Sequence, residues 1–368
     1  MAKPFVSVLI DTYNHEKFIE QAITSVLEQN FPASDYEILV VDDGSTDRTP
    51  ELVKRFAPRV TYLAKENGGQ ASAFNYGIPR CRGEIVAFLD GDDWWEPNKL
   101  AAVTEAMKTN PDVGIVGNGL VIVQPDGTEE RELLLQGKRF RADTPFGAKL
   151  FRVRGSFLGT SRMTIRANVL AEIGAVPEII FFEADEYLFT LAAVFRDALI
   201  LPECLTYYRL HEGNLYQTSV ADPVKDRRKQ AVLQSLSASL VKKLTECKVD
   251  PRAARIITNN VRADADLLRL SMDGGMPWES FQTEWWMYQR VLEDASVFHR
   301  VFKLFTLVPS LLLPPRLYFS WKRRIAGSSR YKNLRNRWLP NPVSDRVSRS
   351  PHSGEPPQQP AVPHRPRG

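Results

Sequence analysis

The chain has 368 residues, 43% of them hydrophobic and 25% charged, as expected for a globular protein with a sizeable core. Its net charge of +4 is unevenly distributed, because twelve Lys and Arg but only two acids follow position 315, which gives that end about +10 and suggests an anionic partner. Three cysteines without C-x-x-C spacing argue against a disulfide framework or a zinc site, and no stretch reaches the roughly 18 apolar residues of a membrane span.

Strands and helices alternate through the first 120 residues. Apolar runs predict strands over residues 5–10, 36–41, 60–64, 84–89 and 113–116. Apolar residues at helical spacing predict helices between them. This alternation is typical of βαβ units, so we expect an α/β fold with a mainly parallel sheet, helices on both faces, and ligands at the carboxyl ends of the strands.

The pattern changes beyond residue 120. We expect a hairpin around Pro125-Asp126-Gly127 with strands over 121–123 and 130–134, helices over 165–173 and 184–195, and short strands over 199–201 and 206–210. The interpretation divides the chain into an α/β domain at 1–220, a helical region at 221–326, and a basic, Pro-rich tail at 327–368. Seven prolines among the last 28 residues predict that this tail is disordered.

Polar clusters follow three of the predicted strands. The carboxyl ends of parallel strands meet at one edge of a sheet, so these clusters predict a single site. They are Asp11-Thr12-Tyr13, Asp42-Asp43 and Asp90-Gly91-Asp92-Asp93.

The three carboxylates at residues 90–93 repel one another, so we expect either a bound divalent cation or a structural role that keeps them together. Hard oxygen ligands suit Mg²⁺ or Mn²⁺, which complete their shell with substrate phosphates. We therefore expect Asp92, with Asp90 or Asp93, to hold a metal bridged to a diphosphate; the alternative is that these acids cap the helix that begins near Pro97. The chain has neither a P-loop nor a G-x-G-x-x-G motif, which leaves a metal-held diphosphate, as in a nucleotide-activated sugar. Trp94 and the residue after it are expected to wall the cleft.

Four segments together carry a family resemblance: VSVLIDTYNHEKFIEQAITSVLEQ, EILVVDDGSTDRT, ENGGQASAFNYGI and GEIVAFLDGDD. In order and spacing they closely resemble the family 2 glycosyltransferases of the GT-A fold, over roughly residues 5–215. The resemblance implies a Rossmann-like GT-A domain and an inverting, metal-dependent transfer from a nucleotide-diphospho-sugar. It also implies that Thr12, Tyr13 and Asp42 hold the base and ribose, and that Asp90 and Asp92 position ribose and metal. Asp11 is assigned to the same nucleotide-sugar site, and Asn67 and Gly69 are expected to shape the pocket.

The resemblance places a catalytic base late in the domain, at the start of a helix. The family has Glu-Asp there, whereas this chain has 182-FEADEYLF-189, with Ala184 at the Glu position. We expect Asp185 to be the base, with Glu183 and Glu186 as substitutes. The alternatives are that Asp185 is a solvated helix-start acid, or that the protein is a catalytically silent sugar-nucleotide-binding scaffold.

The segment 207-YYRLHEGN-214 resembles the family's Y-R-x-H-x-x-N motif. Arg209 can neutralise the leaving diphosphate, and neutral His211 can ligate the metal. The alternative for His211 is a structural role. Lys65 is interpreted as a surface charge rather than a phosphate contact.

The acceptor and the location are less well specified. Residues 154–162 lie where the family shapes its acceptor pocket, and the acceptor is expected to be a glycan or a lipid-linked glycan of cell-surface polysaccharide synthesis. Apolar and basic residues in 302–326 predict a peripheral segment on an anionic membrane, or alternatively a helix packed on the domain. Sparse cysteines favour the cytoplasm, at the inner face of the membrane. A nucleic-acid partner is not expected, because no folded element interleaves aromatic and basic residues.

Overall fold

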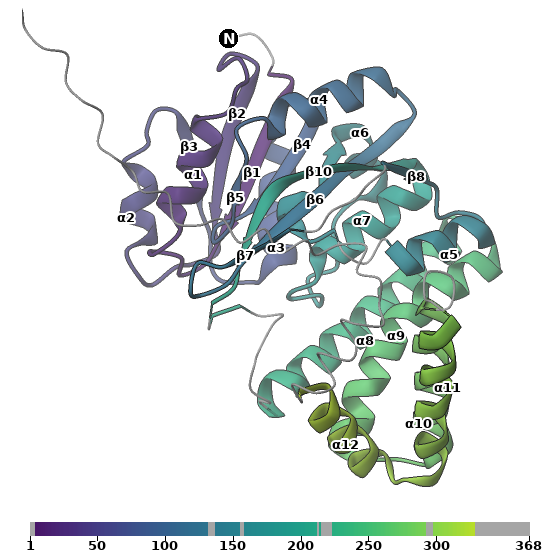
Figure 1. Ribbon diagram of the computed structural model, residues 1–368. Coiled ribbons are helices and arrows are strands. Elements are labelled where there is room, and N and C mark those ends of the chain that lie inside the picture. Colours follow the sequence, from purple (N-terminus) through teal and green to yellow (C-terminus); the bar gives the residue numbers. More distant parts are fainter. Residues whose placement is uncertain are drawn as a thin grey trace, which may run out of the picture.

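The computed structural model describes residues 4–131, 137–154, 158–211, 213–214, 223–291 and 297–327. Within them, ten strands form one sheet with the order β3-β2-β1-β4-β9-β6-β10-β5, to which β7 and β8 add at β6 and β10 (Figure 1). The strands are β1 (Val6–Thr12), β2 (Tyr36–Asp42), β3 (Val60–Ala64), β4 (Ile85–Asp90), β5 (Trp94–Trp95), β6 (Val113–Val123), β7 (Glu129–Arg131), β8 (Lys138–Phe140), β9 (Thr164–Arg166) and β10 (Asp197–Arg209).

Helices cover both faces of this sheet and continue beyond it. They are α1 (Ile19–Leu27), α2 (Thr49–Lys54), α3 (Gln70–Gly77), α4 (Lys99–Thr109), α5 (Pro145–Arg154), α6 (Ala167–Ile173), α7 (Ala184–Phe195), α8 (Pro223–Glu246), α9 (Pro251–Asp273), α10 (Pro277–Val291), α11 (Val297–Leu312) and α12 (Pro315–Gly327). Two short 3₁₀ helices, η1 (Ile78–Arg80) and η2 (Thr160–Arg162), interrupt the loops.

The sheet separates two hydrophobic cores, because side chains alternate between the faces of a strand. On β1, Val8 and Ile10 pack in one core with residues of α1, α2 and α4, whereas Leu9 packs in the other with residues of α3, α6 and α7. All three side chains are fully buried. A strand buried on both faces explains the uninterrupted apolar runs of the sequence.

The second half of the sheet combines parallel and antiparallel pairs, so it is mixed rather than mainly parallel. Two of the elements expected there were also wrong. The segment 165–173 is not one helix: β9 pairs antiparallel with β4 and β6 before α6 begins at Ala167. Three residues are too few for strand alternation to show in the sequence. The two short strands expected near 199–210 are one strand, β10, whose register shifts at bulges near Cys204.

The hairpin is confirmed between β6 and β7, with Val121 opposite Arg131, although its second strand was expected to continue over 132–134, outside the described residues. The tail at 328–368 also lies outside them. Helix α7 begins at Ala184, and Gly174 ends α6 with a φ of 77°, both as expected.

Helices α8–α12 form a layer beyond one end of the sheet, next to α5 (Figure 1). Leu236 and Leu240 of α8 and Ile257 of α9 belong to the same core as α7, so this layer is continuous with the sheet domain. Helix α12 packs back on α9, where Tyr318 and Phe319 bury Leu270. None of the helices in the described ranges combines the length and apolar composition needed to cross a bilayer.

Candidate active site

The polar clusters after the strands meet at one edge of the sheet, as expected. Thr12 of β1 lies opposite Asp42 of β2, and Asp11 lies opposite Asp90 of β4. The loop that follows β4 packs tightly over the end of β1. A Cβ atom at Gly91 would lie 2.6 Å from Thr12 Oγ1, which explains why the middle residue of Asp-Gly-Asp has no side chain.

Asp90, Asp92 and Asp93 each place a carboxylate oxygen within 4.8 Å of the others, but their contacts differ. Both oxygens of Asp93 are already bonded, since Oδ2 accepts from Ser161 Oγ at 2.6 Å and Oδ1 from the backbone N of Arg209 at 3.0 Å. Asp93 therefore stabilises the loop after β4. The sequence left open whether Asp90 or Asp93 accompanies Asp92 at a metal, and these bonds favour Asp90.

Asp92 is the acid that contacts histidine. Its Oδ2 is hydrogen-bonded to His211 Nε2 at 2.9 Å and lies 3.8 Å from His15 Nε2. Burial raises the pKa of Asp92, but the hydrogen bond with His211 and the charge of His15 outweigh burial, so its pKa is lowered. Asp92 is therefore the carboxylate of this cluster that is most readily ionised.

The neighbouring acids, Asp11 and Asp90, are difficult to ionise. Burial and repulsion from Asp92 raise the pKa of Asp11 to about 8, and burial followed by repulsion from Asp11 raises the pKa of Asp90 well above its usual value. Asp11 Oδ1 is buried and has no hydrogen-bond partner among the described residues. A bound cation would relieve both the repulsion and the unsatisfied oxygen.

The end of β10 ties Arg209 and His211 to this cluster. Arg209 Nε donates to the backbone O of Asp92 at 3.0 Å. Its guanidinium lies 4.4 Å from the ring centre of Trp94 and 4.9 Å from that of Phe18. Arg209 is thus clamped between two aromatic rings beside the acids, a placement that the sequence motif did not reveal.

Asp185 lies in the first turn of α7 and is held by the preceding 3₁₀ helix η2. Its Oδ2 accepts from Thr160 N at 3.0 Å and from Thr160 Oγ1 at 3.3 Å. Burial raises the pKa of Asp185, while bonds from Glu186 N and Thr160 partly offset the rise. The charge of Asp185 in turn helps to raise the pKa values of Asp11 and Asp90, so it lies near the acidic cluster.

Glu183 occupies a different environment. Burial raises its pKa to about 8, with contributions from Asp185 and from Asp264 on α9 and an opposing one from Lys229 on α8. Its backbone has a φ of 69°, and its Oε1 is buried without a hydrogen-bond partner in the described part of the chain. Its electrostatic neighbours include helices α8 and α9, so its surroundings differ from those of Asp185.

The two acids after β2 shape the neighbouring loops. Asp42 is 1% exposed, and it accepts from Ser45 N and Tyr62 Oη, both at 2.8 Å. Asp43 accepts from Gly69 N at 2.7 Å and forms an ion pair with Lys65. The interpretation of Lys65 as a surface charge was wrong, because its side chain is 13% exposed and Nζ lies 2.6 Å from Asp43 Oδ1.

The turn before α3 brings Asn67 and Gly69 to the same edge. Asn67 Nδ2 donates to the backbone O of Asp43 at 2.9 Å. Gly69 has a φ of 84°, and a Cβ there would lie 2.3 Å from the backbone O of Phe181. Tyr13 lies at this edge with a side chain that is 45% exposed.

Comparison with known proteins agrees with this geometry. The sequence profile of glycosyl transferase family 2 matches residues 7–170. A glycosyltransferase of Nostoc sp. whose activity is uncharacterized is 33% identical over 224 residues, which cover 59% of this chain and 68% of that protein. The chain belongs to glycosyl transferase family 2. It is a glycosyltransferase enzyme, so the alternative of a silent scaffold is not retained.

Two further proteins are similar to this family 2 glycosyltransferase. TuaG of Bacillus subtilis, named for teichuronic acid biosynthesis, is 41% identical over 110 residues, or 28% of this chain and 42% of TuaG. The mannosyltransferase PcManGT of Pyrobaculum calidifontis, solved with GDP-Man and Mn²⁺, superposes with a TM-score of 0.52 and 20% identity over 92% of this chain and 88% of that one. The fold is therefore of the GT-A type.

The acidic cluster of this family 2 glycosyltransferase is suited to a divalent cation that prefers oxygen ligands. Asp90 and Asp92 offer carboxylate oxygens at one point, and His211 offers an imidazole nitrogen beside Asp92. The orphaned oxygen of Asp11 lies on the neighbouring strand. Carboxylate oxygens with one imidazole suit Mg²⁺ or Mn²⁺.

Sequence reasoning did not single out His15 or Gln70, and it placed Thr160 and Ser161 only within the segment 154–162 expected to shape the acceptor pocket, without their bonds to Asp185 and Asp93. Gln70 Nε2 donates to Thr160 Oγ1 at 2.9 Å, and its Oε1 accepts from the backbone N of Ala184 at 3.0 Å. His15 follows the first strand within the quoted motif, so its position could have indicated it. The roles of Thr160 and Ser161 depend on a loop packing that no local pattern encodes.

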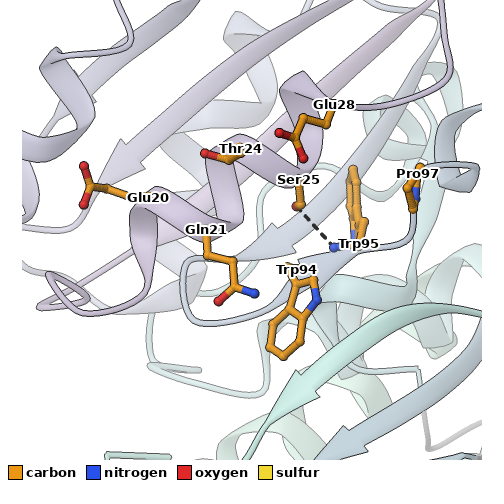
Figure 2. Close-up of a pocket in the computed structure, with 8 residues that line it drawn as sticks. All are labelled: Glu20, Gln21, Thr24, Ser25, Glu28, Trp94, Trp95 and Pro97. Atoms are coloured by element: carbon orange, nitrogen blue, oxygen red, sulfur yellow. Dashed lines mark hydrogen bonds between the residues drawn. The ribbon is translucent and has the colours of Figure 1, made fainter. Parts of the chain in front are cut away.

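A pocket of about 310 Å³ lies outside the acidic cluster, between α1 and residues Trp94, Trp95 and Pro97 (Figure 2). Glu20 and Glu28 line it, and no Lys or Arg is among its eight lining residues. An acidic lining repels a diphosphate. The backbone N of Trp95 already donates to Ser25 Oγ at 3.2 Å, so it is not a free donor for a ligand.

Proposed function

We propose that this glycosyltransferase transfers a sugar from a nucleotide-diphospho-sugar to an acceptor hydroxyl with inversion at the anomeric carbon. The observation that carries the proposal is the cluster of Asp90 and Asp92 at the sheet edge, with His211 hydrogen-bonded to Asp92. Such a cluster is suited to a divalent cation and a diphosphate, because each offsets the charge of the other. The complex of PcManGT with GDP-Man and Mn²⁺ supports the same choice of donor class and metal.

The donor site combines the residues at the carboxyl edge of β1–β4. We assign the nucleotide sugar to Asp11, Thr12, Tyr13, Asp42, Asn67, Gly69, Asp90, Asp92 and Arg209. Their convergence at the ends of adjacent parallel strands supports this assignment. Because both oxygens of Asp42 accept bonds from the protein, we expect Asp42 to act by shaping the loop around the base and ribose.

Asp90, Asp92 and His211 would hold Mg²⁺ or Mn²⁺. The bound ion would neutralise charge that develops on the diphosphate leaving group. Arg209 adds positive charge beside the same acids, and its bond to the backbone of Asp92 orients that loop.

Asp185 is the proposed base. The acceptor oxygen forms a bond to the anomeric carbon while the bond from that carbon to the diphosphate oxygen breaks, and the hydroxyl proton passes to the Asp185 carboxylate. Thr160 holds this carboxylate by two hydrogen bonds, and burial raises its pKa towards the working pH, which strengthens it as a base. The mixed surroundings of Glu183, which include α8 and α9, make it the weaker candidate.

The acceptor is proposed to be a glycan or lipid-linked glycan in cell-surface polysaccharide synthesis. The name of TuaG supports this pathway class. We place the reaction in the cytoplasm, because all three cysteines are free, which fits a reducing compartment.

A donor screen tests the proposal. Release of nucleoside diphosphate is measured for a panel of UDP-, GDP- and dTDP-sugars, with Mg²⁺ or Mn²⁺ and with a chelator. We expect release from one donor class, its loss with chelator, and a fall of at least about 100-fold in Asp92→Asn with an unchanged circular dichroism spectrum. Glu105→Asn, an exposed acid on α4, is the matched control.

Undiminished turnover in Asp92→Asn would refute the metal assignment. Turnover that survives the chelator would refute metal dependence. Retention of the anomeric configuration in the product, followed by NMR, would refute inversion and with it the single-step role of Asp185.

A further inference from the structure

Helix α11 exposes an apolar face. Every described side chain of α11 that is exposed is apolar, and these are Val301, Leu304, Phe305, Val308, Leu311 and Leu312. They recur at intervals of three or four residues, which places them in one stripe along the helix. Phe305 and Leu312 are 71% and 73% exposed. A water-facing helix surface normally has the opposite composition, so this stripe (the α11 stripe) requires a partner.

The opposite side of α11 is held by the protein. Leu307 and Ser310 are buried, and α11 packs against α10. The stripe is therefore presented outward by a helix whose other side is fixed. Figure 1 shows α11 at the margin of the C-terminal helical layer, away from the sheet edge that carries the acids.

The charge around α11 identifies the partner. Residues 297–327 contain six Lys and Arg and no Asp or Glu, and one of these cations, Lys322, forms an ion pair with Glu284 of α10. Arg316, Arg323 and Arg324 of α12 are exposed. An apolar stripe in a segment with cations and no acids matches a surface that is apolar inside and anionic outside, as a bilayer with anionic lipids is.

A second copy of the chain fits less well. Pairing two α11 stripes would bring two basic segments together with no acid of their own to offset the charge. The helix is also too short to cross a bilayer, since 16 residues extend about 24 Å, against about 30 Å of hydrocarbon. A helix of this length with a one-sided stripe lies in the plane of the interface.

We propose that α11 docks this enzyme on an anionic lipid bilayer by burying the α11 stripe at the interface, with the cations of α12 on the lipid head groups. The structure changes the earlier interpretation of 302–326. Within this segment, Tyr318 and Phe319 of α12 are buried against α9, whereas the exposed apolar stripe lies on α11, so α11 is the part assigned to the lipid. The proposal does not depend on the donor or the metal.

Vesicle flotation of the full-length chain tests the proposal. The vesicles are pure phosphatidylcholine, or phosphatidylcholine with about one third phosphatidylglycerol, at low and high salt. We expect binding to the anionic vesicles only, weakened by salt. The double variant Phe305→Gln/Leu312→Gln should bind at least about tenfold more weakly, because it removes the two most exposed apolar side chains of the stripe without changing charge.

The matched control is Ile179→Gln/Val224→Gln, which removes two equally exposed apolar side chains outside α11. It should bind like the wild type. Equal binding by Phe305→Gln/Leu312→Gln would show that charge alone holds the chain and would overturn the proposal. Absence of vesicle binding, or light scattering that shows a dimer abolished by Phe305→Gln/Leu312→Gln, would overturn it in favour of another partner.

Discussion

Replacing Glu183 with Gln should change how the stability of this enzyme depends on pH. Burial, with repulsion from Asp185, raises the pKa of Glu183 from 4.5 to about 8 in the folded chain. Between these two values the folded state keeps a proton that the unfolded state has released. The free energy of unfolding should therefore be largest below pH 4.5 and fall as the pH rises towards 8.

The magnitude follows from the size of the shift. One pKa unit corresponds to about 1.4 kcal/mol, so the difference between 4.5 and about 8 sets an upper bound of about 5 kcal/mol. Relaxation around the carboxylate reduces this figure. From pH 5 to pH 8, we expect the wild type to lose about 2 to 4 kcal/mol more unfolding free energy than Glu183→Gln. The variant should therefore be the more stable protein at pH 8.

Urea unfolding at pH 5, 6.5 and 8 measures this difference. Asp11 also has a raised pKa of about 8 and contributes the same trend to both proteins, so the comparison between them isolates Glu183. Glu178→Gln is the control, because Glu178 is exposed and lies only five residues away. Parallel pH profiles for wild type and Glu183→Gln would refute the burial of a protonated Glu183.

Two further substitutions examine the active site directly. Asp185→Asn should lower kcat by about 10²- to 10⁴-fold while donor affinity, measured by calorimetry, changes much less; full acceptor transfer would move the base to Glu183. Gly91→Ala places a methyl group 2.6 Å from Thr12 Oγ1 and 2.8 Å from His15 Nδ1, so it should cost about 1 to 3 kcal/mol of unfolding free energy and at least about tenfold in turnover. Unchanged stability and turnover would contradict this prediction, because they would show that the end of β1 accommodates the added methyl group without loss.

The sequence predicted the first half of the fold well because its signals are local. Strands buried on both faces appear as apolar runs, and β1, β2 and β4 end at the acids that the runs precede. The convergence of Asp11 with Asp90 followed from parallel topology alone. Beyond residue 160 the elements depend on tertiary pairing, so β9 was taken for the start of a helix and β10 for two strands.

The site was predicted less completely than the fold. The motifs singled out Asp92, Asp185 and His211 as candidates, and in the structure His211 is hydrogen-bonded to Asp92. No motif could show that Arg209 would lie between the rings of Phe18 and Trp94, because the two rings come from separate elements that only the tertiary fold brings together. Nor could a pattern show which acid of the cluster is already bonded by the protein, as Asp93 is.

The 3₁₀ helix η2 connects the proposed base to the acidic loop. Thr160 grips Asp185, and the next residue, Ser161, donates to Asp93 and accepts from the backbone N of Asp90 at 3.0 Å. Two consecutive residues of η2 therefore connect the proposed base to the loop that would face the leaving group. A displacement of η2 would therefore move the proposed base and the acidic loop together.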